Sequence, residues 1–99
     1  MNTHPILFNA EFDLLILDAK TEADKAMTKF PQPNYVISKI AEESGELVKA
    51  AIHCAEGRGS IDEVRAEAVQ ALAMIFRLCA EGDEIHGLEP IFKNVDEVK

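Results

Sequence analysis

The segment from Ala66 to Ala80 is the feature of the sequence that most constrains the fold. Only Glu67, Gln70 and Arg77 are polar within it, so a helix here presents apolar side chains on nearly every side. Such a helix is typical of the centre of a helical domain, because each apolar face has to be covered. We expect the other helices of a short chain to leave part of it uncovered, which favours a homodimer or homotetramer.

Two amphipathic helices are predicted before this segment. Over residues 8–30, apolar residues recur at steps of three and four, which is the period of a helix with one apolar face. Pro31 and Pro33 disfavour helical backbone at the residues before them, so the first helix ends there. The same apolar period continues over residues 35–56, and Asn34 is the expected N-cap of this second helix.

The third helix includes the apolar segment and has start and stop signals of its own. Ser60 followed three residues later by Glu63 forms a capping box, and Gly82 is the predicted stop. Residues 83–99 have enough spaced apolar residues for one short helix. The predicted fold is therefore all-α, a single domain over residues 1–99. It is a small antiparallel bundle of three main helices plus a short C-terminal helix, completed by oligomerisation.

Charge and composition exclude several classes of function. The formal net charge is -8, whereas proteins that bind a nucleic-acid polymer depend on clustered Lys and Arg. The sequence contains no run of about 18 apolar residues and no secretion signal, so we expect a cytoplasmic protein without a membrane span. Cys54 and Cys79 show no CxxC spacing, and we interpret them as buried thiols.

Two glutamates are predicted to lie beside apolar surface. Glu43 lies three residues after Ile40 and four before Leu47, at the border of the apolar stripe of the second helix. Glu67 lies on a side of the third helix that is otherwise apolar. An ionised carboxylate there without a partner would cost several kcal/mol. We therefore expect Glu67 to be paired, protonated or bound to a metal.

A magnesium ion would neutralise the charge of several of these acids at once. Glu42, Glu43 and Glu46 offer the hard oxygen ligands that Mg²⁺ prefers, and substrate phosphates fill its remaining positions. Taken alone, such a cluster is typical of a solvated acidic face with local lysine pairs. The further acid on an apolar helix, Glu67, favours the metal. Lys39, one turn before Glu43, is a candidate contact for substrate phosphate or a surface partner of the nearby acids.

Two short motifs resemble those of a known family. Glu43-Ser44-Gly45-Glu46 is followed, after a spacer of twenty residues, by Glu67-Ala68-Val69-Gln70. This order resembles the ExxE, spacer, ExxD pattern of the MazG-like all-α nucleoside triphosphate pyrophosphohydrolases. The resemblance covers roughly residues 30–78, about half of the chain. The departure is Gln70, which stands where the family has an aspartate and brings no negative charge.

The resemblance implies an enzyme that hydrolyses a ribo- or deoxyribonucleoside triphosphate to the monophosphate and pyrophosphate. It implies magnesium as the cofactor, with manganese as a substitute, and a metal-activated water as the nucleophile. The residues that carry these roles by resemblance are Glu43, Glu46 and Glu67 as direct ligands, Gln70 as a weaker ligand, Glu42 and Glu43 as catalytic groups, and Lys39 as the phosphate contact.

Two other functions stay open from the sequence. Gln70 and the scarcity of basic residues near the acids are compatible with a catalytically inactive member of the same fold, which would act as a helical oligomerisation or partner-binding module. Alternatively, hydrolysis is retained but the substrate is a related phosphoribosyl-linked nucleotide. A panel of substrates distinguishes these possibilities.

Overall fold

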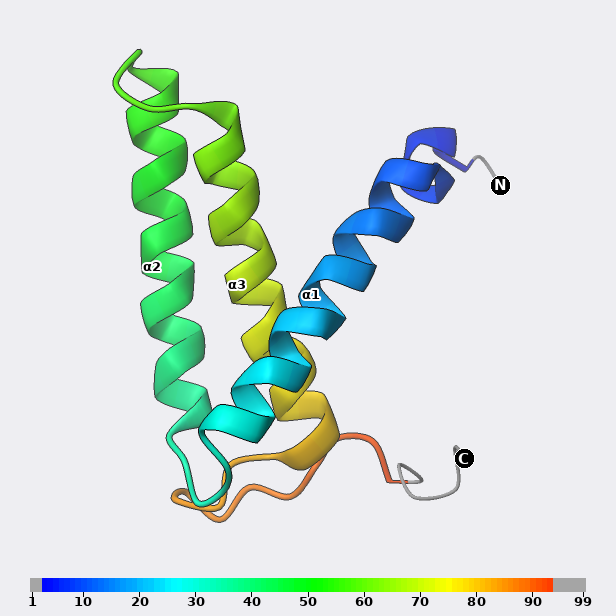
Figure 1. Cartoon of the computed structure of the whole chain (residues 1–99), viewed down its shortest axis with the longest axis vertical. Coiled ribbons are helices and arrows are strands. Elements are labelled where there is room, and N and C mark those ends of the chain that lie inside the picture. Colours follow the sequence, from blue (N-terminus) through cyan, green and yellow to red (C-terminus); the bar gives the residue numbers. More distant parts are fainter. Residues whose placement is uncertain (1–2, 94–99) are drawn as a thin grey trace.

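The computed structural model describes residues 3–93 and is helical throughout its regular parts (Figure 1). A 3-10 helix η1, Pro5–Phe8, leads into three long helices: α1, Ala10–Lys29; α2, Val36–Ala55; and α3, Ile61–Glu81. The described residues form no strand. The prediction of an all-α fold with three main helices is thereby confirmed.

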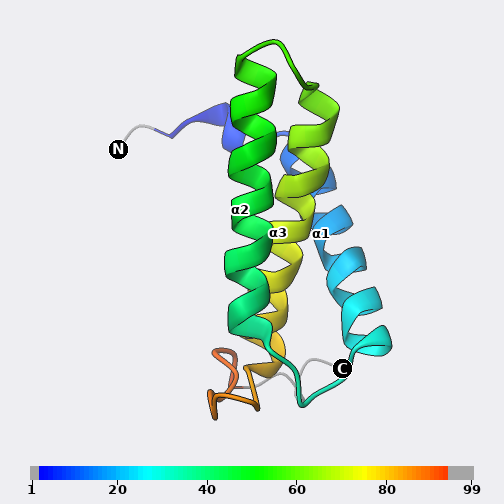
Figure 2. The same ribbon diagram turned by 90° about the vertical axis from the view of Figure 1, so that its left-hand side faces the viewer.

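The helix α3 lies at the centre of the arrangement. It forms an antiparallel hairpin with α2 on one side and packs against α1 on the other (Figures 1 and 2). The C-terminal half of α1 lies close to α3, whereas its N-terminal half diverges from the hairpin. Small side chains allow the close approach, because Ala23 of α1 and Ala73 of α3 are both buried and form the core with Met74. The sequence correctly predicts α3 as the central helix.

The covering of α3 is incomplete, and apolar side chains of all three helices remain exposed. Ile75 of α3 is 41% exposed, Leu17 of α1 is 57% exposed, and Val48 of α2 is 57% exposed. In the part of the chain that the structure describes, no helix combines the length and the apolar character needed to cross a membrane. The predicted oligomer, which would cover such surfaces, stays a prediction.

The ends of α3 follow the local signals in the sequence. The Ser60 hydroxyl accepts a hydrogen bond from the backbone N–H of Glu63 at 3.1 Å, as the capping-box pattern predicts. Gly82 follows the helix with a φ of 70°. A Cβ atom at this position would overlap the backbone of Leu88, so both the backbone conformation and the close packing require glycine.

The N-terminus of α2 is capped by a distant residue, and the prediction that Asn34 caps it is wrong. The helix begins at Val36, and the residue at the cap position, Tyr35, makes no side-chain cap. The carboxylate of Asp83, which follows α3, instead accepts a hydrogen bond from the backbone N–H of Ile37 at 2.9 Å. A contact across 46 residues gives no local sequence signal.

Gln32 joins the same two segments from the other side. Its side-chain oxygen accepts hydrogen bonds from the backbone N–H groups of Glu84 at 3.0 Å and Asn34 at 3.1 Å, and its amide nitrogen donates to the Gly82 carbonyl. We call Gln32 and Asp83, with their partners, the clasp. It lies where the α1–α2 connection meets the segment after α3 (Figure 2).

The segment after α3 does not form the predicted short helix within its described part. Residues 82–93 contain turns and an antiparallel bridge in which Asp83 and Leu88 exchange backbone hydrogen bonds of 2.9 Å. The paired backbone and the tight turn at Gly87, whose φ is 71°, satisfy groups that a helix would otherwise use. The remainder of this prediction falls on residues 94–99, which lie outside the described residues.

Asp83 gives the clasp a predictable dependence on acid. The side chain of Asp83 is fully enclosed, and burial raises its pKa. Hydrogen bonds from the backbone N–H groups of Ile37 and His86, and from the His86 ring, act in the opposite direction and are stronger. Together they lower the pKa of Asp83 from 3.8 to about 2. The folded protein therefore holds this proton less tightly than the unfolded chain. Its ionised carboxylate stabilises the fold above about pH 4, and this contribution is lost between about pH 4 and pH 2.

We expect Asp83→Asn to lower the Tm by about 4–8 °C at pH 7, because Asn offers only one acceptor atom where Asp83 uses two. The Tm of the variant and of the wild type should be measured by circular dichroism between pH 2 and pH 7. The difference should shrink as the pH falls below 4. A difference that is the same at every pH would show that the ionised carboxylate does not stabilise the clasp.

Candidate carboxylate site

The predicted acids lie on the two helices of the hairpin. Glu42, Glu43 and Glu46 belong to α2, and Glu67 belongs to α3. Glu43 and Glu67 are half-buried, whereas Glu42 and Glu46 are exposed. Solvent reaches the side chain of Glu67, which reduces the cost of its charge.

Glu43 has a carboxyl group with a raised pKa. Burial is the largest cause that raises the pKa of its carboxyl group, followed by repulsion from Glu67, Glu42 and Glu46, while Lys39 acts in the opposite direction. Repulsion from Glu67 reaches Glu43 across the interface between the two helices. The hairpin therefore concentrates negative charge around one half-buried carboxylate.

Glu46 and Glu67 line a common groove of about 210 Å³ between α2 and α3. The groove exists because Ala50 of α2 and Ala66 of α3 are small side chains at facing positions. Its remaining lining residues are charged or polar, and they are Lys49, His53 and Glu63. On α2, Lys49 and His53 lie three and seven residues after Glu46, so all three occupy one face of the helix.

Gln70 lines a different cavity, on the side of α3 that faces α1. This cavity also contains Asp18 and Glu22 of α1. Both acids already have partners, since Arg65 contacts Asp18 at 3.0 Å and Lys25 contacts Glu22 at 3.4 Å. Gln70 is absent from the lining of the Glu46–Glu67 groove. The structure therefore does not bring all four residues of the two motifs to one groove.

Lys39 is directed to an aromatic ring. Its ammonium nitrogen lies 5.3 Å from the centroid of the Phe30 ring, and that of Lys29 lies 5.4 Å from the same centroid. Both distances are within the range of a cation–π contact. Lys39 is near enough to lower the pKa of Glu43, but it does not line the groove that contains Glu46 and Glu67.

Arg77 fixes the backbone beside these lysines. It is fully buried, and its guanidinium donates to the carbonyl of Phe30 and to the carboxylate of Glu81. Its remaining terminal nitrogen, Nη1, has no hydrogen-bond partner among the described residues. The sequence places Arg77 on a different side of the helix from Glu67, but it gives no sign that Arg77 is the largest fully buried side chain.

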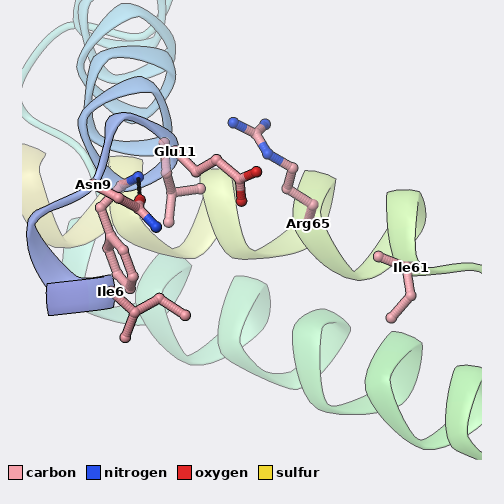
Figure 3. A pocket seen from close by; sticks show the side chains of 7 residues that line it. Ile6, Asn9, Glu11, Ile61 and Arg65 are labelled. Atoms are coloured by element: carbon pink, nitrogen blue, oxygen red, sulfur yellow. Dashed lines mark hydrogen bonds between the residues drawn. The ribbon is translucent and has the colours of Figure 1, made fainter. Parts of the chain in front are cut away.

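Two further cavities contain none of the predicted site residues. One, of about 280 Å³, opens where α1 diverges from α3, and Glu11 and Arg65 stand among apolar neighbours such as Ile6 and Ile61 (Figure 3). Another, of about 600 Å³, is almost entirely apolar and lies between α1, α3 and Phe92. The second cavity lacks the convergent polar groups of a catalytic site. The thiols of Cys54 and Cys79 are free and half-buried, so they are less enclosed than the sequence predicts.

The donor chemistry of the carboxylate site fits magnesium, although the side chains are not drawn together. The acids offer only hard oxygen atoms, and after burial the negative charges of Glu67, Glu42 and Glu46 help to raise the pKa of Glu43. Within residues 3–93, no three His, Cys, Asp or Glu side chains are grouped closely enough to hold a metal ion as they stand. Glu43 does not line the groove that contains Glu46 and Glu67, so coordination by all three acids requires their side chains to rotate toward one another.

No protein-family model matches the chain, and no curated protein or solved structure matches it either. A functional interpretation of the carboxylate site therefore depends on its own residues and geometry.

Proposed function

We propose that the protein is a magnesium-dependent nucleoside triphosphate pyrophosphohydrolase, which converts the triphosphate to the monophosphate and pyrophosphate. The observation that supports it is the half-buried carboxyl group of Glu43, whose pKa is raised by burial and then by the negative charges of Glu67, Glu42 and Glu46 on the two helices of the hairpin. A divalent cation favours the ionised form of every member of such a cluster and binds polyphosphate at the same time. In a chain of net charge -8, it also reverses the local charge that would repel the substrate.

The residues have distinct roles in this proposal. Glu43, Glu46 and Glu67 would hold the cation, which when bound would supply charge neutralisation and a water of lowered pKa. Glu42 is exposed beside them and accepts the proton of the attacking water. Gln70 is the weakest member, because it lies toward α1 and would reach the cation only through a water or after rotation. No nucleophilic side chain is required.

The second candidate is a helical oligomerisation or partner-binding module. The exposed apolar side chains favour it, since each long helix leaves at least two large ones uncovered. This candidate assigns the acids to a solvated face and predicts that magnesium and nucleotide have no effect on stability. Both the enzyme and the partner-binding module are compatible with a homodimer or homotetramer. The oligomeric state therefore does not distinguish these two functions.

A thermal-shift experiment tests the proposed function. We expect magnesium together with a triphosphate whose α and β phosphorus atoms are bridged by a methylene group to raise the Tm, because the pair binds only the folded protein. At a ligand concentration of about 100 times Kd, the stabilisation is about 2.7 kcal/mol, which corresponds to a rise in Tm of about 10–20 °C for a domain of this size. Magnesium alone and the analogue with a chelator are the controls.

The same panel should then be tested as hydrolysable nucleotides by measuring released pyrophosphate. Ribo- and deoxyribonucleoside triphosphates and a phosphoribosyl-linked nucleotide belong in it. No thermal shift and no pyrophosphate with any of them would contradict the proposed function and favour the partner-binding module.

A further inference from the structure

The position of the substrate's phosphates can be inferred from the cations near the carboxylate site. Two sets are available: Lys39, before the acids on α2, and the pair Lys49 and His53, after them. The ammonium of Lys39 lies over the Phe30 ring and outside the groove. Lys49 and His53 both line the groove that contains Glu46 and Glu67. The open space beside the acids therefore extends away from Lys39.

Lys49 and His53 are available to a ligand. Among the described residues, neither side chain takes part in a hydrogen bond or an ion pair, although Glu46, Glu63 and Glu67 line the same groove. Arg65, in contrast, is already paired with Asp18 at 3.0 Å. The groove thus combines carboxylates suited to a cation with two uncommitted nitrogen donors suited to an anion.

A polyphosphate complexed with a divalent cation is the class of ligand that matches both parts. Carboxylates alone would repel its phosphates, and nitrogen donors alone would not hold its metal. The small side chains of Ala50 and Ala66 leave about 210 Å³ of space between the two parts. A short anion can therefore lie along the hairpin from Glu46 and Glu67 toward His53.

We propose that Lys49 and His53 are the direct contacts of the substrate's phosphate chain, and that Lys39 is not. This assignment rests on the proposed function, because it takes the ligand to be the metal complex of a triphosphate. Lys39 has a structural role instead, in which it contacts Phe30 and offsets the charge of Glu43. The phosphate chain then extends toward the loop between α2 and α3.

Direct binding tests this assignment without requiring turnover. The affinity of the wild type for the methylene-bridged triphosphate and for inorganic tripolyphosphate is measured by titration calorimetry, with magnesium present. Lys49→Gln and His53→Ala should each weaken binding of both probes by about tenfold. Lys39→Gln is the matched control, a lysine of the same helix, and should change the Kd by less than about twofold.

Melting curves show whether each variant is folded, and exposed Lys49 can also be replaced by Glu, which should weaken binding further. If the wild type binds both probes but Lys49→Gln and His53→Ala bind equally well, or if Lys39→Gln is the variant that weakens binding, the assignment is wrong and the proposed function stands. If the wild type binds neither probe, the proposed function is wrong as well.

Discussion

Glu67→Gln should abolish magnesium-dependent release of pyrophosphate, lowering kcat/KM by about 100-fold or more. Glu67 is the only acid of the motifs on α3 and shares the groove with Glu46. Its loss removes a charged ligand from one whole side of the proposed cation. The amide keeps the shape of the side chain, so the effect measures charge and coordination and not packing. Steady-state kinetics over a range of magnesium concentrations would measure it.

The fold should survive this change. Repulsion from Glu67 raises the pKa of Glu43, so its removal relieves unfavourable charge and should not lower the Tm. Glu84→Gln is a suitable control because its side chain is exposed after α3 and outside the groove. Activity that is unchanged in Glu67→Gln, or lost equally in Glu84→Gln, would exclude the carboxylate site as the reaction centre.

Arg77→Ala should have the largest effect on stability, lowering the free energy of unfolding by about 3 kcal/mol and the Tm by about 15 °C. The fully buried guanidinium joins Phe30, at the end of α1, to Glu81, at the end of α3. The substitution leaves the Phe30 carbonyl with one fewer donor and Glu81 without its partner, and it opens a cavity. Thermal and urea unfolding would measure both quantities.

Two further variants separate the causes of this loss. Arg77→Met restores most of the volume but no donor, so it should recover only a small part of the stability. Arg65→Ala removes an arginine whose ion pair with Asp18 is about 43% exposed at the arginine and 42% at the aspartate, and it should cost less than about 1 kcal/mol. Equal losses in Arg77→Ala and Arg65→Ala would contradict the role assigned to the buried guanidinium.

The sequence predicts the fold where the signals are local. Apolar periodicity predicts three helices, and Ser60 and Gly82 place the ends of α3 correctly. Long-range contacts explain the failures. Asp83 caps α2 from 46 residues away, and the segment after α3 pairs with itself and with Gln32 instead of forming a helix. No pattern within one segment indicates such a partner.

The carboxylate site is predictable to a similar extent. The acids of both motifs lie on facing helices, as their spacing suggests, but the spacing gives no indication of which side chains meet across the interface. The sequence does indicate that Lys49 and His53 lie on the same helical face as Glu46, because they follow it by three and seven residues. The structure is needed to interpret this spacing, because it shows that Glu67 and the small side chain of Ala66 line the same groove from α3.

The clasp also determines when the protein can complete its fold during synthesis. The backbone N–H groups at the start of α2 lack side-chain capping until Asp83 is available, and Gln32 gains its contact with Glu84 only across 52 residues. The helix that carries Glu43 and Glu46 is therefore translated long before its cap. The first turn of α2 therefore acquires its side-chain cap only after α3 and residue 83 have been synthesised.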